Sequence, residues 1–250
     1  MLKVELHTHT ADDPADPIPY STFELIDRAA ELGYDALAIT LHDKQLDLTG
    51  YVEYAAARNI VLIPGIERTI KGRHVLLLNF SSAAESVQSF DDVARLKARE
   101  RGIVIAPHPF FPAGSALRGQ LIKYAHLFDA VEWNAMFTPL INFNAIAERW
   151  ARRHGKPMVG NGDVHRLEML GTTYSLVDAA PNADAICKAI AAGRVQVVAT
   201  PLSMYTATRL MADLYVGNFV PRRHVGSDPA TAHHRGQTPV TSRLNVAGQL

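Results

Sequence analysis

The stretch Lys3-Val4-Glu5-Leu6-His7-Thr8-His9 joins an apolar run, typical of a buried strand, directly to a pair of histidines. Side chains two residues apart in an extended chain share a face, so His7 and His9 are expected to point the same way. A second pair with this spacing, Asp163 and His165, follows much later in the chain. Imidazole and carboxylate groups are the donors that hold divalent cations in hydrolytic sites. The stretch therefore predicts a strand that ends in a metal site.

Outward from this stretch, short apolar runs alternate with amphipathic helical patterns. Seven strands are expected before Asp163, at residues 3–7, 36–40, 60–66, 74–79, 103–106, 130–134 and 158–160. Helices are expected at residues 23–32, 51–57, 91–101, 117–124 and 141–154. Repeated strand–helix units predict an α/β fold in which parallel strands form a TIM-like barrel.

The remainder of the chain divides into two parts. A helix at residues 183–192, a strand at 194–199 and a helix at 204–216 are expected to close or cover the barrel. From Gly217 the composition shifts to Pro, Arg, His, Gly, Ser and Thr without apolar periodicity. Such a segment cannot offset its ordering entropy by burial. We expect one barrel domain over residues 1–216 and a flexible tail over residues 217–250.

Composition excludes several classes of protein. Lys plus Arg equals Asp plus Glu at 25 each, so no net field favours nucleic acid or an anionic membrane, and no stable nucleic-acid partner is expected. No apolar run approaches the roughly 18 residues of a membrane-spanning helix, and no signal peptide is evident, so we expect a cytoplasmic protein. Cys187 is the single cysteine and is expected to be a buried apolar residue.

Metal-ligand residue types recur where the expected strands end. His42 follows the second strand, Glu67 ends the third, and His108 follows the fifth. In parallel strand–helix architectures, functional groups lie at the carboxyl ends of the strands. A single histidine near a strand end is more often a core or surface residue than a ligand. The recurrence at successive strand ends reverses that expectation.

His74 begins its expected strand rather than ending one, so a different feature must bring it to the metal site. A hairpin over residues 67–79, centred between Ile70 and Lys71 with Gly72 easing the turn, would place Glu67 directly opposite His74. Cross-strand partners have Cβ atoms about 4.5 to 5.5 Å apart, which is close enough for both to bind one metal. The proposal depends on this register.

Six segments in order resemble the hallmark motifs of the PHP (polymerase and histidinol phosphatase) family. They are Glu5-Leu6-His7-Thr8-His9-Thr10, Ala38-Ile39-Thr40-Leu41-His42-Asp43, Pro64-Gly65-Ile66-Glu67, Arg73-His74-Val75-Leu76, Ala106-Pro107-His108-Pro109 and Gly160-Asn161-Gly162-Asp163-Val164-His165. The resemblance implies a distorted seven-stranded (β/α) barrel. It also implies phosphoester hydrolysis with two to three divalent cations, Mn²⁺, Fe²⁺ or Zn²⁺.

The resemblance further implies how the ligands are grouped. The first metal would be bound by His7, His9, Glu67 and Asp163. Glu67 would bridge to a second metal, bound also by His74 and His108. His42 and His165 would hold a third with one more ligand, for which Asp13 is preferred over Asp12 and Asp16. Leu41 stands where the family usually has an aspartate, and the loop between Glu67 and His74 is short.

The expected activity is hydrolysis of a small phosphorylated metabolite, a phosphomonoester, by a water activated between metals. Glu67, Asp163 and His165 are the expected catalytic residues, and Arg118 and Arg166 are expected to bind the phosphate. Trp133 and Asn134 could line the pocket. The alternatives are an amidohydrolase-like enzyme that cleaves a C–N or lactone bond, an exonuclease acting on short oligonucleotides, and a metal-binding module without activity.

Overall fold

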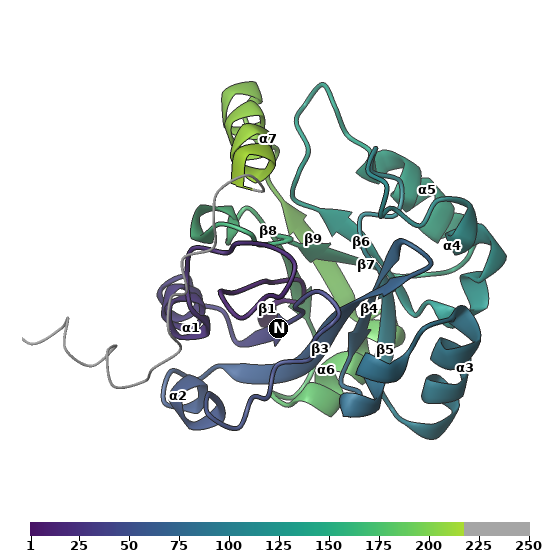
Figure 1. Cartoon of the computed structure of the whole chain (residues 1–250), viewed down its shortest axis with the longest axis horizontal. Helices are drawn as coiled ribbons and strands as arrows, with labels where there is room; N and C mark the ends of the chain where they lie inside the picture. The colour runs from purple at the N-terminus through teal and green to yellow at the C-terminus, as the bar shows by residue number, and fades with distance from the viewer. Residues whose placement is uncertain (218–250) are drawn as a thin grey trace, which may run out of the picture.

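The structure, a computed structural model, describes residues 1–217 of the chain. The strands are β1 (Leu2–Glu5), β2 (Ala36–Ile39), β3 (Val61–Ile70), β4 (Arg73–Leu78), β5 (Ile103–Ala106), β6 (Ala130–Asn134), β7 (Met158–Asn161), β8 (Thr173–Val177) and β9 (Val195–Ala199). The helices are α1 (Thr22–Glu31), α2 (Val52–Ala56), α3 (Phe90–Arg99), α4 (Gly119–Lys123), α5 (Asn144–Arg153), α6 (Ala183–Ala191) and α7 (Met204–Gly217). Figure 1 shows the helices arranged around a strongly curved sheet.

The nine strands form one sheet in the order β7-β6-β5-β4-β3-β2-β1-β8-β9. Its two ends approach each other, since Gly160 N in β7 donates a hydrogen bond to Ser175 Oγ in β8 at 2.8 Å. A Cβ atom at Gly160 would lie 2.6 Å from the carbonyl oxygen of Tyr174, so glycine is required for this close approach. The α/β class and a nearly closed, barrel-like sheet are thus confirmed.

Nine strands of mixed direction do not confirm the expected seven-stranded barrel. Parallel pairs join β1 to β2, β2 to β3, β5 to β6 and β6 to β7, whereas β3–β4, β4–β5, β1–β8 and β8–β9 are antiparallel. A two-residue turn joins β3 to β4, and strands connected so tightly can pair only in antiparallel fashion. The sequence patterns located β1 to β7 and β9 but missed β8.

The side chains of β2 show how the strands divide the core. Ala36 and Ala38 belong to a buried cluster that includes Ile186 and Ile190 of α6, while Leu37 and Ile39 pack in a second cluster with α1. This alternation is the period of two expected for a strand buried on both faces. Cys187 is buried on α6, as expected, and burial raises its pKa to about 12.

Two further expectations concern the C-terminal tail and membrane-spanning helices. Gly217, where we expected the tail to begin, is the last residue of α7, and residues 218–250 of that expected tail lie outside the described residues. None of the described helices is long and apolar enough to span a lipid bilayer.

Candidate metal centre

The first and last motif segments meet through backbone hydrogen bonds. Thr8 and Val164 form a parallel bridge, in which His9 N donates to Val164 O (3.2 Å) and Val164 N donates to His7 O (3.1 Å). Thr40, at the end of β2, accepts from Thr8 N through its hydroxyl at 3.1 Å. These contacts hold His7 and His9 in one extended segment, with both rings on the same side.

Glu67 lies at the centre of the cluster, with its side chain only 1% exposed. Each carboxylate oxygen contacts a different group of histidines. Oε2 lies near three ring nitrogens: His42 Nε2 (3.1 Å), His7 Nε2 (3.3 Å) and His9 Nε2 (3.5 Å). Oε1 lies near two: His74 Nδ1 (2.8 Å) and His108 Nε2 (3.2 Å). One acid therefore connects all five histidines.

The contact between His74 and Glu67 arises from a different register than the sequence predicted. His74 pairs with Thr69, and Glu67 pairs with Leu76, so the expected direct pairing is wrong. The turn is formed by Lys71 and Gly72, both with positive φ (51° and 72°), one residue later than expected. Glu67 and His74 are instead diagonal neighbours on one face, and long side chains can bridge that separation.

Asp163 faces the same group from the end of β7. Its Oδ1 lies 3.4 Å from His7 Nε2, 3.7 Å from His9 Nε2 and 3.4 Å from His165 Nδ1. Its Oδ2 accepts a hydrogen bond from Asn134 Nδ2 at 3.1 Å. Asp163 has a φ of 50° and His108 a φ of 27°, conformations that are costly for non-glycine residues and that concentrate at functional sites.

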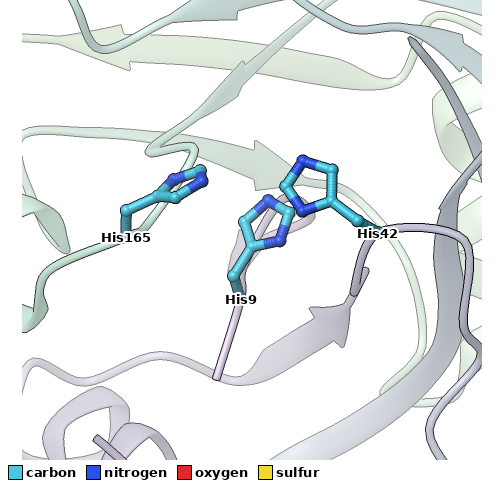
Figure 2. A group of neighbouring side chains, drawn as sticks. All are labelled: His9, His42 and His165. Atoms are coloured by element: carbon cyan, nitrogen blue, oxygen red, sulfur yellow. The ribbon is translucent and has the colours of Figure 1, made fainter. Parts of the chain in front are cut away.

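Figure 2 shows a further group, in which the rings of His9, His42 and His165 face one another. The ring centroid of His9 lies 4.4 Å from that of His42 and 4.3 Å from that of His165. Nitrogen atoms of the three residues lie within 4.8 Å of one another. This group shares His9 and His42 with the Glu67 cluster and adds the imidazole of His165.

The three candidate aspartates of the following loop occupy different positions. Asp13 Oδ2 contacts His9 Nδ1 at 2.9 Å and His42 Nδ1 at 3.0 Å, on the sides of the rings away from Glu67. Asp16 Oδ2 lies 3.0 Å from His165 Nε2 and 3.9 Å from His42 Nδ1. Asp12 accepts hydrogen bonds from the hydroxyl groups of threonines outside the cluster. The hydrogen bonds of Asp13 suit a residue that orients ligands, and Asp16 approaches the third group directly.

The titrating groups of the centre strongly shift one another's pKa values. Burial raises the pKa of Glu67, but the charges of His7 and His74 outweigh burial and hold this pKa well below its usual range. The pKa of Asp163 is likewise well below its usual range, because the charge of His7 and a hydrogen bond with His9 outweigh burial. For His42, burial is opposed by a hydrogen bond with Asp13 and by the charge of Glu67, which raise the pKa to about 9. The centre therefore favours ionised carboxylates.

The donor set fits divalent cations. Among the described residues, four buried imidazole nitrogens lack a hydrogen-bond partner: His7 Nε2, His9 Nε2, His74 Nδ1 and His108 Nδ1. The donor atoms of His7, His9 and Glu67 lie within 4.8 Å of one another, as do those of His7, His108 and Asp163 and those of His42, Glu67 and His74. Unpartnered buried nitrogens beside carboxylates are the mixed N and O set that Mn²⁺, Fe²⁺ and Zn²⁺ accept.

The two arginines expected to bind phosphate lie in different environments. Arg166 is partly buried, and its Nη1 donates to the carbonyl oxygen of His165 at 2.9 Å. Arg118 is exposed, stands before α4 with a φ of 46°, and donates weakly to Phe111 O at 3.5 Å. No described contact joins either guanidinium to the carboxylates of the centre.

Sequence reasoning missed two buried acids. Glu5 accepts from the backbone N–H groups of His7 and Gly162, and burial raises its pKa to about 8. Glu132, from β6, lies 2.8 Å from His7 Nδ1. Both are acids next to buried apolar residues in short strands, and a charge in such a place must find partners when the strand is buried. That placement was the available signal.

Comparisons with known proteins show similarity in one segment of the sequence and in the fold. Residues 142–195 match the family model described as PHP-associated. A two-domain protein from Bacteroides vulgatus that contains a predicted PHP-like metal-dependent phosphoesterase has a TM-score of 0.63 and 18% identity, over 85% of this chain and 69% of that one. PsfC from Pseudomonas syringae has a TM-score of 0.58 and 16% identity, over 87% and 98%. The lesion-specific endonuclease Q of Pyrococcus furiosus has a TM-score of 0.54 and 14% identity, over 84% and 66%.

No curated protein sequence gives a significant match. The chain is thus similar to PHP domains in the order of its six motifs, in the PHP-associated match over residues 142–195 and in the fold that it shares with these solved structures.

Proposed function

We propose that this chain is a metal-dependent hydrolase that cleaves a small phosphomonoester. The observation that carries the proposal is the contact of one ionised, buried carboxylate, Glu67, with five histidine nitrogens. A purely structural carboxylate would not require so many imidazoles, several with unpartnered nitrogens. The structural neighbours add support, since one contains a PHP-like phosphoesterase.

The proposed ligand groups follow the contacts. The first metal would be held by His7, His9, Glu67 and Asp163, and the second by Glu67, His74 and His108. The third would be held by His42 and His165, with Asp16 now favoured over Asp13 because Asp16 reaches the ring nitrogen of His165. Bound cations would supply Lewis acidity toward a phosphoryl oxygen and toward water.

The protein side chains have distinct parts in this proposal. Asp163 is 20% exposed, against 1% for Glu67, so Asp163 is the central carboxylate that can exchange a proton with solvent, with His165 beside it. Its Oδ2 is held by Asn134, which leaves Oδ1 directed into the centre. Arg166 lies next to His165 and is favoured over Arg118 for binding the phosphate, because Arg118 is exposed.

A nucleic-acid phosphodiester is the second candidate substrate. It is favoured by the similarity to endonuclease Q, which was also solved with a 27-mer duplex carrying an abasic lesion. It is opposed by the zero net charge of this chain, which supplies no general attraction for a polyanion.

The test is a substrate screen with a matched set of variants. Protein purified without oxygen would be analysed for metals and assayed with added Mn²⁺ or Zn²⁺ on phosphorylated metabolites, a phosphodiester, an abasic duplex and amide or lactone substrates. We expect phosphomonoester turnover that is lost in His9→Ala and kept in His126→Ala, an exposed histidine on another segment. Turnover of amides or lactones alone would favour the amidohydrolase alternative, and bound metal without any turnover would favour a binding module.

A further inference from the structure

Glu132 is a buried acid that the proposed ligand set leaves out. It lies in β6 between Val131 and Trp133, and it is completely inaccessible to solvent. An ionised carboxylate in such a place is costly unless hydrogen-bond donors surround it. Hydrogen-bond donors must therefore offset the cost of burying the Glu132 carboxylate.

Four donors converge on this one carboxylate. Oε2 accepts from His7 Nδ1 at 2.8 Å and from Asn161 Nδ2 at 3.1 Å. Oε1 accepts from Asn134 Nδ2 at 2.8 Å and from the backbone N–H of His108 at 3.2 Å. Only a group that accepts at both oxygens can satisfy all four. Glutamine has the same shape but would present an amide N–H₂ to two of these donors.

The hydrogen bond between Glu132 and His7 Nδ1 determines the role of Nε2, the other ring nitrogen of His7. The Nδ1 atom that faces the carboxylate must carry a proton, so Nε2 is the nitrogen that can offer a lone pair. His7 Nε2 points toward Glu67 and Asp163, at 3.3 and 3.4 Å, and lacks a hydrogen-bond partner among the described residues. Metal-binding histidines commonly donate their second N–H to a carboxylate in this way.

We propose that Glu132 is a positioning residue that aims His7 Nε2 at the metal centre. The proposal rests on the proposed function, because it takes His7 as a ligand. The same carboxylate also reaches Asp163 through Asn134, whose Nδ2 donates both to Glu132 Oε1 and to Asp163 Oδ2. Glu132 thus connects three ligand-bearing segments, those of His7, His108 and Asp163, without contacting the reacting atoms.

The first arm of the test measures metal affinity. Zn²⁺ would be titrated against a competing chelator for the full chain, for Glu132→Gln and for Ser175→Ala, a buried change in β8 that removes hydrogen bonds with Gly160 instead. We expect Glu132→Gln to bind Zn²⁺ about 10- to 100-fold more weakly, the range found when such an outer partner of a ligand is lost. Ser175→Ala should bind as the unchanged chain does.

The second arm observes the hydrogen bond itself. In ¹⁵N-histidine-labelled protein, the Nδ1–H proton of His7 should resonate far downfield because it is held by a carboxylate, and it would be assigned by its loss in His7→Gln. This resonance should shift or broaden in Glu132→Gln. Should that variant not fold, Asn161→Ala, which loosens Glu132 without removing it, should weaken Zn²⁺ binding to a smaller degree.

The outcomes separate the two proposals. Failure of the unchanged chain to bind any divalent cation would overturn the proposed function. Zn²⁺ binding that is equally tight in the unchanged chain and in Glu132→Gln would overturn only the positioning role, as would the absence of a downfield His7 resonance from the unchanged chain.

Discussion

Glu67 carries a buried negative charge that its histidine neighbours offset. Its pKa stays well below the usual range because the charges of His7 and His74 outweigh the effect of burial. Both of its oxygens lie near imidazole nitrogens, and under the proposed function it would join two metals. At the scale of single residues, this side chain is the one on which the whole ligand arrangement depends.

Replacing Glu67 with glutamine should therefore remove metal binding while keeping side-chain volume. We expect the affinity for Zn²⁺ or Mn²⁺ to fall by more than about 100-fold, beyond the effect of losing an outer partner of a ligand. Isothermal titration and metal analysis would measure this loss. Glu148→Gln, a change at a partly exposed residue on α5, serves as the control, and unchanged metal content in Glu67→Gln would contradict the central role of this acid.

The raised pKa of His42 predicts how stability depends on pH in the metal-free protein. Its folded pKa of about 9 lies above the ordinary value of 6.5, so folding favours the protonated ring. This contribution to stability is complete below pH 6.5 and is lost as the pH rises through 9. We expect the unfolding temperature of chelator-treated protein to fall across this window, and the fall to be smaller in His42→Gln. A midpoint that stays constant over the window would count against this charge network.

At the scale of elements, the β3–β4 hairpin explains why a register error still left a correct contact. The sequence located both strands, but it could not show which two residues form the turn. Lys71 and Gly72 form it, with φ values of 51° and 72°. This shift leaves Glu67 and His74 on the same face, so the diagonal contact replaces the expected direct one.

The same turn offers a stability prediction. Two-residue turns with positive φ at both positions favour Asn-Gly, and lysine is a poor residue for the first position. Lys71→Asn should raise the free energy of unfolding by about 0.5 to 1 kcal/mol. Urea denaturation would measure it, with Gly72→Ala expected to destabilise. A lower midpoint for Lys71→Asn would show that the exposed Lys71 has another role in the hairpin.

The parts of the fold that the sequence predicts depend on local patterns, whereas the parts that it does not predict depend on contacts between residues far apart in the chain. Local patterns located β1 to β7, and at the start of α1 the local pair Ser21 and Glu24 forms a capping box. The strand β8 was missed because the buried polar residues Thr173 and Ser175 interrupt its apolar run, and because its pairing with β1 joins segments far apart in the chain. The role of Glu132 was missed because two of its partners, His7 and Asn161, are distant in the sequence. The resemblance at the level of the fold predicted that the motif residues converge. The hydrogen bonds that orient these residues could not be predicted from the sequence, because they depend on the three-dimensional structure.

At the scale of the whole molecule, the buried acids and histidines of the centre are concentrated where the strands β1, β2, β5 and β7 end. The remaining core is apolar and includes the cluster in which α6 packs against interior side chains. A centre with several mutually coupled acids and imidazoles is satisfied best when cations replace protons between them. Metal occupancy should then affect the stability of the entire domain.

Metal removal should lower the unfolding temperature of the full chain. At a free cation concentration of about 1,000 times Kd, binding to the folded state alone adds about 4 kcal/mol to the free energy of unfolding. Differential scanning calorimetry before and after chelation, with re-addition of Zn²⁺ or Mn²⁺, would measure the shift. His9→Ala should show little response to re-added metal, and identical transitions with and without cation in the unchanged chain would contradict the prediction.

The hydrogen bond from Gly162 to Glu5 joins residues 157 positions apart, next to the Thr8–Val164 bridge. Contacts of such long sequence separation form slowly, because the intervening chain must first lose its freedom. During synthesis, a ribosome-bound chain holds His7 and His9 long before Asp163 and His165 emerge. Under the proposed function, cation capture by the complete set would therefore belong to the last stage of maturation, after the intervening strands have assembled.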